Sequence, residues 1–430
     1  MKIVVLGGGL AGIAFTYEAS RLGYNVVIVE KENSLGGLLR SENINGYMFD
    51  TGGSHILFSR DKQRMRFFSR LLGDNVVRHR RDARVYFEGK FIKYPFENGL
   101  YMLSPEFRYR ALRDLVHRYI KYKCGSQENV TNFEEWIYAT FGETIAESYL
   151  IPYNRKLWKR DLREISPEWG GNRVPNPPLD DILRSAVGIE TEGYIHQLNF
   201  IYPRSGGIQG LVDAFETRLR KRSNVEIMLG QRGESIDTSE KIIELSGGEV
   251  IRYDRLVSSI PLPEIIRLAR LKKSPLLDYN SLIVVGIGVK EKRLPHYHWV
   301  YFPDRKTPFH RVAFLSNYSP FMAPRNGASI LAEITVYPGE RVDPEQVVQK
   351  TIEGLESVGL VKQGNIEVAR AWFWKYGYVV YNKAYTESVS RVKSELRRVG
   401  IVPIGRFGLW AYLNMDDVVF SSFEAAHSIR

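Results

Sequence analysis

The first thirty residues alternate short apolar runs with one helical pattern. Residues 2–6 and 25–29 are short and rich in β-branched side chains, as strands buried in a parallel sheet are. Between them, residues 10–21 carry apolar side chains at the spacing of a helix. The pattern therefore predicts a strand, a helix and a second strand that form one β-α-β unit.

The rest of the chain predicts a helical part and a second, strand-rich part. Residues 84–87 and 90–92 flank Glu88-Gly89 in the manner of a hairpin, and the amphipathic pattern from 105 to about 150 is typical of helices. Further strand-like runs lie at 225–229, 242–245, 256–260, 281–289, 299–302, 329–336 and 401–404. Helical patterns follow Gly210 and Asp416 and cover 346–358.

These elements predict an α/β fold. We expect a Rossmann-like FAD-binding domain with a helical insertion, and a second, mostly antiparallel β-sheet domain. The FAD-binding domain would be discontinuous, built from 1–92, 200–275 and 395–430. A mainly helical substrate domain would cover 93–199 and the sheet domain 276–394. We expect the ligand cleft where these units meet.

Composition narrows the class of protein. With 430 residues, of which 44% are hydrophobic, the chain can bury a large core, which excludes a disordered or collagen-like protein. The single cysteine, Cys124, excludes an internal disulfide and favours a reducing compartment, so we expect a cytoplasmic protein. Because no run of about 18 apolar residues occurs, we expect no integral membrane segment.

The net charge does not indicate a particular class of partner. There are 60 Lys and Arg against 49 Asp and Glu, a net charge of +11, but the basic residues are scattered, so we expect no nucleic-acid partner. His296 and His298 alternate without a third ligand nearby. We interpret them as strand surface and expect no metal site.

Three glycines in the predicted β-α-β unit indicate a dinucleotide site. Gly7 permits a tight turn, Gly9 lets backbone approach a pyrophosphate, and Gly12 allows helix and strand to pack closely. The pyrophosphate would lie at the positive end of the helix. Glu30 ends the second strand, where its carboxylate could accept hydrogen bonds from a ribose.

The residues that follow distinguish a flavin from a nicotinamide. Gly36 and Gly37 resemble the double-glycine motif of flavoproteins in the glutathione-reductase-like and amine-oxidase group. Residues 46–58, which include Gly53 and Ser54, resemble that group's loop against the isoalloxazine ring. The combined resemblance favours FAD as the cofactor.

Segments along nearly the whole chain resemble the UDP-galactopyranose mutase family. In order they are GGSHILFSR (52–60), KYPFENG (93–99), NFEEWI (132–137), PYNRKLW (152–158), EWGGNRVPNP (168–177), YPRSGGIQG (202–210), residues 299–320, YGY (376–378) and GRFGLWAYLNMDD (405–417). Residues 299–320 are most similar to the eukaryotic type, and YLNMDD is similar to a bacterial ending.

The resemblance implies an enzyme that interconverts UDP-galactopyranose and UDP-galactofuranose for glycan biosynthesis. Members of the family require reduced FAD, whose N5 attacks the anomeric carbon and expels UDP, so that the sugar ring can open and reclose. The expected partner is a UDP-sugar, and NAD(P)H is a candidate reductant. The helical insertion could be exposed or could form an oligomer interface.

The resemblance also implies site residues. Arg173 and Arg311 would hold the diphosphate, and His55 would lie beside the flavin. Residues expected to bind the substrate are Tyr94, Phe96, Asn154, Trp158, Tyr301, Tyr378 and Tyr412. Residues expected to lie near the cofactor, in addition to the glycines, Ser54 and Glu30, are Arg406, Asn414, Met415 and Asp416.

Two departures from the family pattern leave alternatives open. Glu97 replaces a glutamine, and Asn414 replaces the first acid of the bacterial ending, so the substrate could be a different UDP-sugar. An FAD-dependent oxidoreductase of the amine-oxidase or protoporphyrinogen-oxidase-like group would share the N-terminal motifs. A flavin-binding protein without catalytic activity is a third reading.

Overall fold

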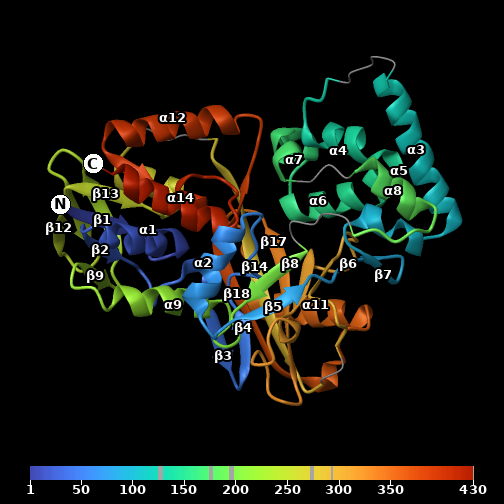
Figure 1. Ribbon diagram of the computed structural model, residues 1–430, viewed down its shortest axis with the longest axis horizontal. Coiled ribbons are helices and arrows are strands. Elements are labelled where there is room, and N and C mark those ends of the chain that lie inside the picture. Colours follow the sequence, from blue (N-terminus) through green and yellow to red (C-terminus); the bar gives the residue numbers. More distant parts are fainter. Residues whose placement is uncertain (124–128, 174–177, 193–197, 272–275, 292–293, 430) are drawn as a thin grey trace.

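The first layer of the fold is a five-stranded parallel sheet. The computed structural model describes residues 1–123, 129–173, 178–192, 198–271, 276–291 and 294–429, with the side chains of 122–123 and 171–173 left out. The sheet runs in the order β19-β13-β1-β2-β9. Figure 1 shows β13, β1, β2 and β9 side by side. Its strands are β1 (Lys2–Leu6), β2 (Asn25–Val29), β9 (Val225–Met228), β13 (Arg255–Ser258) and β19 (Ile401–Pro403). The chain thus returns twice to the sheet that begins with its N-terminal strand, first for β9 and β13 and then for β19.

Helices cover this sheet and complete the dinucleotide-binding layer. α1 (Leu10–Arg21) is buried over most of its length and packs against α14 (Met415–Ser428) and α9 (Gln209–Leu219). The other helices in this part are α2 (Lys62–Leu72), α10 (Leu262–Leu268), α12 (Tyr385–Arg398) and α13 (Gly405–Gly408). Three small sheets pair β3 (Ser41–Ile44) with β4 (Tyr47–Asp50), β5 (Val77–Arg80) with β8 (Asn199–Tyr202), and β10 (Gly233–Asp237) with β11 (Ile242–Leu245) and β12 (Val250–Arg252).

A seven-stranded sheet forms the second layer. Its order is β18-β14-β17-β16-β15-β6-β7, and all neighbours are antiparallel except the parallel pair β15 and β6. The strands are β6 (Ala83–Phe87), β7 (Lys90–Lys93), β14 (Asp278–Val289), β15 (Trp299–Tyr301), β16 (Arg311–Phe314), β17 (Ala328–Val336) and β18 (Ile366–Val380). α11 (Pro344–Ser357) contacts β14 and β18.

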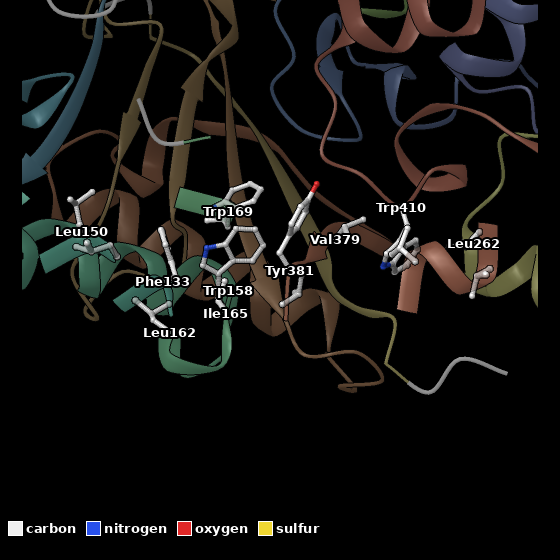
Figure 2. Packing of buried hydrophobic residues seen from close by; sticks show 14 of the residues in the cluster. Phe133, Leu150, Trp158, Leu162, Ile165, Trp169, Leu262, Val379, Tyr381 and Trp410 are labelled. Atoms are coloured by element: carbon white, nitrogen blue, oxygen red, sulfur yellow. The ribbon is translucent and has the colours of Figure 1, made fainter. Parts of the chain in front are cut away.

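The helical insertion lies at one end of this sheet (Figure 1). Its elements are η2 (Phe96–Met102), α3 (Pro105–Lys123), α4 (Phe133–Phe141), α5 (Glu143–Ile145), η3 (Ala146–Leu150), α6 (Ile151–Trp158), η4 (Leu162–Glu164), α7 (Glu168–Arg173) and α8 (Leu179–Ala186). Its core is continuous with side chains from the end of β18 and from the residues that follow β18 and α13, among them Val379, Tyr381 and Trp410. The rings of Trp158 and Trp169 pack edge to face with their centres 4.7 Å apart, and the ring centre of Tyr381 lies 5.4 Å from that of Trp169 (Figure 2). In the described residues no helix is both long and apolar enough to cross a membrane.

The predicted fold class is confirmed, with three local differences. The hairpin β6–β7 forms as expected, but it extends the large sheet and does not belong to the layer assigned to 1–92, because β6 pairs with β15. Residues 242–245 pair within a small separate sheet. His298 precedes β15 and is only 7% exposed, so the interpretation of His298 as strand surface was wrong.

Candidate functional site

A cavity of about 660 Å³ lies between the parallel sheet and the seven-stranded sheet. It begins at the carboxyl ends of β1 and β2, where open α/β sheets bind ligands, and continues to the face of β15, β16, β17 and β18. The cavity brings together most of the residues singled out in the sequence. They are Gly7, Gly9, Glu30, Gly36, Gly37, Ser54, His55, Tyr301, Arg311, Tyr378, Arg406, Tyr412, Asn414 and Met415.

The glycine turn has the geometry that a bound pyrophosphate requires. Gly7 adopts φ +100, a conformation that favours glycine. A Cβ on Gly12 would lie 2.0 Å from the carbonyl oxygen of Gly7, so this position needs glycine for packing. A Cβ on Gly9 would meet no atom within 4 Å, although Gly9 caps the N-terminus of α1 and lines the cavity. The open space at Gly9 therefore fits a ligand phosphate held by the helix N-terminus.

Alanine at these two glycines is expected to have opposite effects. Gly9→Ala should leave the unfolding temperature of the FAD-free protein unchanged and lower bound FAD, because the new methyl group enters only the ligand's space. Gly12→Ala should lower the unfolding temperature itself, because its methyl group meets backbone. Thermal melting and flavin absorbance of purified protein measure both effects. Equal FAD content in Gly9→Ala and the unchanged protein would contradict this reading.

Glu30 and the double glycine complete the dinucleotide end of the cavity. One oxygen of Glu30 accepts the N–H of Gly8 at 2.6 Å and the other accepts the N–H of Glu32 at 3.0 Å. Gly36 donates its N–H to the carbonyl oxygen of Gly8 at 2.8 Å and adopts φ +126. The carboxylate is thus fixed at the cavity wall, where a ribose hydroxyl can reach it.

Glu333 organises the other end of the cavity and was missed in the sequence. It stands on β17 opposite Arg311 of β16, which in turn stands opposite Tyr301 of β15. Its carboxylate accepts from Nε of Arg311 at 3.0 Å and from Nη2 at 2.6 and 2.7 Å. It also accepts the N–H of Ser54 at 2.8 Å. Burial alone would lower the pKa of Arg311, but the charge of Glu333 outweighs it and raises that pKa, so the guanidinium stays charged.

His55 is held neutral beside this pair. Its Nδ1 lies 2.8 Å from the carbonyl oxygen of Gly53, which can only accept, so Nδ1 carries the hydrogen and Nε2 keeps its lone pair. Burial, with the nearby charges of Arg311 and Arg406, lowers the pKa of His55 to about 4. Gly53 adopts φ +104, and a Cβ there would lie 3.3 Å from the Glu333 carboxylate.

Two tyrosines enclose the guanidinium of Arg406. Its central carbon lies 3.9 Å from the ring centre of Tyr412 and 5.5 Å from that of Tyr378, and the two rings stack with 9° between their planes. Nε of Arg406 is buried and makes no hydrogen bond within the described part of the chain. Burial raises the pKa of Tyr378, so its hydroxyl remains a donor. All three side chains line the cavity and could donate to an anion.

A cluster of aromatic rings surrounds Tyr301. The ring centre of Tyr301 lies 4.9 Å from that of Tyr94 and 5.4 Å from that of Tyr153. Arg81, a second residue missed in the sequence, places its guanidinium 5.3 Å from the ring centre of Tyr94. Arg81 is 8% exposed, its Nη1 makes no hydrogen bond, and it forms no ion pair in the described residues.

Four predicted substrate residues do not line the cavity: Tyr94, which is half-buried, and three residues of the core, Phe96, Asn154 and Trp158. Phe96 is wholly buried, its ring centre stacks 4.9 Å from that of Tyr149, and the structure places it in the core and not at the cavity. Asn154 and Trp158 are four residues apart on α6 and bond to each other: Nε1 of Trp158 donates to Oδ1 of Asn154 at 3.2 Å. The amide of Asn154 donates to the carbonyl oxygen of Leu150 at 2.8 Å.

The remaining predicted residues divide between the cavity and its surroundings. Asn414 and Met415 line the cavity at the N-terminus of α14. Asp416, one residue later, is buried, and its Oδ2 lies 3.5 Å from Nη1 of Arg64. Arg173 ends α7, and its side chain lies outside the described residues. Within those residues, no group of three or more His, Cys, Asp or Glu side chains could hold a metal ion.

Two family models match the chain. One, described as an NAD(P)-binding Rossmann-like domain, matches residues 5–71, which include the glycine turn. The other, described as flavin-containing amine oxidoreductase, matches residues 111–366, more than half of the chain.

Curated relatives match parts of the chain. An uncharacterized protein in the nifH2 3′ region of Methanothermococcus thermolithotrophicus is 48% identical over 52 residues, 12% of this chain and 50% of that protein. The 4,4′-diaponeurosporene oxygenase of Staphylococcus aureus is 23% identical over 282 residues, 60% of this chain and 55% of that protein. The chain thus spans about half the length of the curated relatives it matches.

Solved structures match the whole chain. A reduced UDP-galactopyranose mutase has a TM-score of 0.90 and 28% identity, covering 99% of this chain and 94% of that one. A protoporphyrinogen oxidase-like protein of Exiguobacterium sp. has a TM-score of 0.74 at 17% identity, covering 99% and 98%. The predicted resemblance to the mutase family is confirmed, and the second likeness shows the shared flavoprotein fold.

Proposed function

Because the chain belongs to the flavin-containing amine oxidoreductase family and its cofactor is FAD, we propose that it is a mutase of UDP-sugars. The proposed reaction interconverts UDP-galactopyranose and UDP-galactofuranose and requires reduced FAD. The observation that carries the proposal is the set of anion donors beside the flavin loop. Arg311, Arg406, Tyr378 and Tyr412 all line the cavity that begins at the dinucleotide cradle.

These donors fit a diphosphate that is both bound and released. When bound and reduced, FAD would supply the nucleophile for the anomeric carbon, so the protein needs no nucleophilic side chain of its own. Arg311 would hold the negative charge of departing UDP, with its orientation fixed by Glu333. The phenols of Tyr378 and Tyr412 would donate hydrogen bonds without adding charge.

The flavin loop, residues 46–58, forms hydrogen bonds to both Glu333 and Arg311. Ser54 donates its N–H to Glu333, while Nη2 of Arg311 donates to the carbonyl oxygen of Ser54 at 3.3 Å. The loop that carries His55 is therefore attached to the cation that would hold the diphosphate. We infer that this attachment keeps the sugar's leaving group at a fixed distance from the flavin.

A direct assay tests the proposal. The FAD-loaded protein, reduced with dithionite, is incubated with UDP-galactofuranose, and UDP-galactopyranose is followed by chromatography. We expect conversion by the reduced protein and none by the oxidised protein. Absence of conversion with every UDP-sugar tried would overturn the proposal.

An FAD-dependent oxidoreductase is the second candidate, since the family match and the Exiguobacterium likeness are shared with such enzymes. It predicts oxygen or NAD(P) consumption in proportion to product, whereas the mutase reaction has no net redox change. A mutase of another UDP-sugar is distinguished by the substrate that is converted in the same assay, with Asn414 at the cavity wall as the first residue to exchange.

Arg81 is expected to contribute to substrate affinity. Burial raises the pKa of both Tyr94 and Tyr301, so these phenols keep the hydrogen that they can donate, and the positive charge of Arg81 opposes the rise. Arg81→Ala should raise the KM for the UDP-sugar about tenfold with a smaller change in kcat. The unfolding temperature should not fall, because the change removes a buried charge without an ion pair.

The neighbouring Arg80 supplies a matched control. Its side chain is 64% exposed and pairs with Glu192, so Arg80→Ala should leave both kinetic constants unchanged. Arg81→Lys should restore part of the affinity. Steady-state kinetics of the three variants test this prediction. A KM for Arg81→Ala equal to that of Arg80→Ala would show that Arg81 does not contribute to substrate affinity.

A further inference from the structure

We propose that the protein has a second binding site, for a small phosphate ester, in a cavity at the amino ends of β13 and β19. This cavity has a volume of about 420 Å³. Among the described residues, none lines both this cavity and the large one, which lies at the opposite, carboxyl ends of the parallel strands. The inference is therefore independent of the proposed mutase activity.

The charged residues that line this second cavity are mostly basic. Lys241, Arg255, Lys393 and Arg397 line it, against one carboxylate, Asp254. Oδ2 of Asp254 already accepts the backbone N–H of Lys2 at 2.6 Å. The cations come from two regions far apart in the sequence, Lys241 with Arg255 and Lys393 with Arg397, so their convergence on one cavity is a property of the fold.

Lys393 and Arg397 are the most informative of these cations. They are four residues apart on α12, so they share one face of the helix, beside the core face formed by Val389, Val392 and Leu396. Like charges at this spacing repel each other; Lys393 is half-buried and Arg397 is exposed. Burial also lowers the pKa of Lys393. A bound anion would relieve both the repulsion and the desolvation.

The rest of the lining specifies the remainder of the ligand. Val399, Ile401, Val402, Pro403 and Leu409 give the cavity an apolar wall. Its volume falls within the range of small-molecule sites and exceeds what a single phosphate fills. A phosphate joined to a body the size of a nucleoside matches the cations and the apolar wall together.

Calorimetric titration of the FAD-loaded protein at low salt tests this site, with adenosine monophosphate and inorganic pyrophosphate as probes. Two double variants remove equal charge from α12: Lys393→Met with Arg397→Met inside the cavity, and Arg391→Met with Arg398→Met outside its lining. Arg311→Lys reports on the large cavity.

We expect adenosine monophosphate to bind, and the first double variant to weaken it about tenfold. The second double variant and Arg311→Lys should bind as the unchanged protein does. Equal weakening in the two double variants, or loss in Arg311→Lys alone, would overturn the proposal. So would binding of pyrophosphate without binding of adenosine monophosphate, because the apolar wall would then have no role.

Discussion

Replacing Glu333 with glutamine is expected to lower the turnover of the UDP-sugar about 100-fold while FAD remains bound. The carboxylate fixes Arg311 through Nε and Nη2 and accepts the N–H of Ser54 in the flavin loop. An amide offers one acceptor oxygen where the carboxylate has two, and its NH₂ group would face the guanidinium. Arg311 and the backbone of Ser54 would then no longer be held by the same carboxylate.

The same change is expected to lower the free energy of unfolding by about 3–5 kcal/mol, because it leaves the guanidinium of Arg311 without its counterion. Glu333 is 1% exposed, so solvent cannot substitute for the lost carboxylate. Glu367→Gln is the matched control on the same sheet, since Glu367 is exposed and accepts only the hydroxyl of Tyr47 among its described contacts.

Steady-state kinetics and thermal melting separate the two effects of Glu333→Gln. At a temperature where both variants are folded, the loss should appear in kcat more than in KM if Glu333 positions Arg311 for the departure of UDP. A Glu333→Gln enzyme that is less stable but has the kcat of Glu367→Gln would show that Glu333 supports only the fold.

The glycines of the cofactor turn were predictable because their requirement is local. A turn, a helix start and a strand follow one another within a few residues, so the sequence pattern alone defines what each position must tolerate. The structure confirms it at Gly7, by its φ of +100, and at Gly12, by the 2.0 Å approach of backbone.

Side-chain direction within matched segments was not predictable in the same way. A motif places a segment near a site, but on α6 the side chains of Asn154 and Trp158 bond to each other. Phe96 likewise packs in the helical core. Which side of a helix faces the ligand depends on packing between elements far apart in the chain.

Glu333 carried a signal that could have been found. It is one carboxylate in the nine-residue strand β17, ASILAEITV, which is otherwise apolar or small and buried throughout. A charge inside such a strand requires a partner, so an arginine on a neighbouring strand was to be expected. The pairing of β16 with β17, which no local pattern specifies, identifies that partner as Arg311.

Acid is expected to destabilise the protein between pH 6.5 and 4. Burial lowers the pKa of His55 and of His298 to about 4, and it also lowers those of His79 and His310. The unfolded chain takes up protons as pH falls through 6.5, whereas the folded chain resists them. The stability that these histidines contribute is therefore fully present above pH 6.5 and is lost as pH falls toward 4.

The buried carboxyl of Asp50 makes the protein more stable as pH falls, but it does not cancel the stability lost through the histidines. Burial raises the pKa of Asp50 to about 6, although the hydrogen bonds from Tyr202, Ile208 and Ser41 act to lower it. The stability that protonated Asp50 contributes is therefore fully present below the ordinary aspartate pKa and is lost as pH rises through 6. Near pH 5, His55 and His298 each take up a proton on unfolding whereas Asp50 releases one, so acid still favours the unfolded chain, and the lowered pKa values of His79 and His310 act in the same direction.

Variants of His296 and His298 test the contribution of a single buried histidine to this pH dependence. His298 is buried and accepts the N–H of Asp82 at Nδ1, a contact that an asparagine oxygen can replace, whereas His296, two residues earlier, is exposed. His298→Asn should reduce the loss of unfolding free energy between pH 7 and pH 4.5 by about 2–3 kcal/mol, and His296→Asn should leave it unchanged. Urea denaturation at the two pH values, with FAD in fixed excess, measures the difference. An identical pH dependence in both variants would show that His298 is not held neutral by its burial.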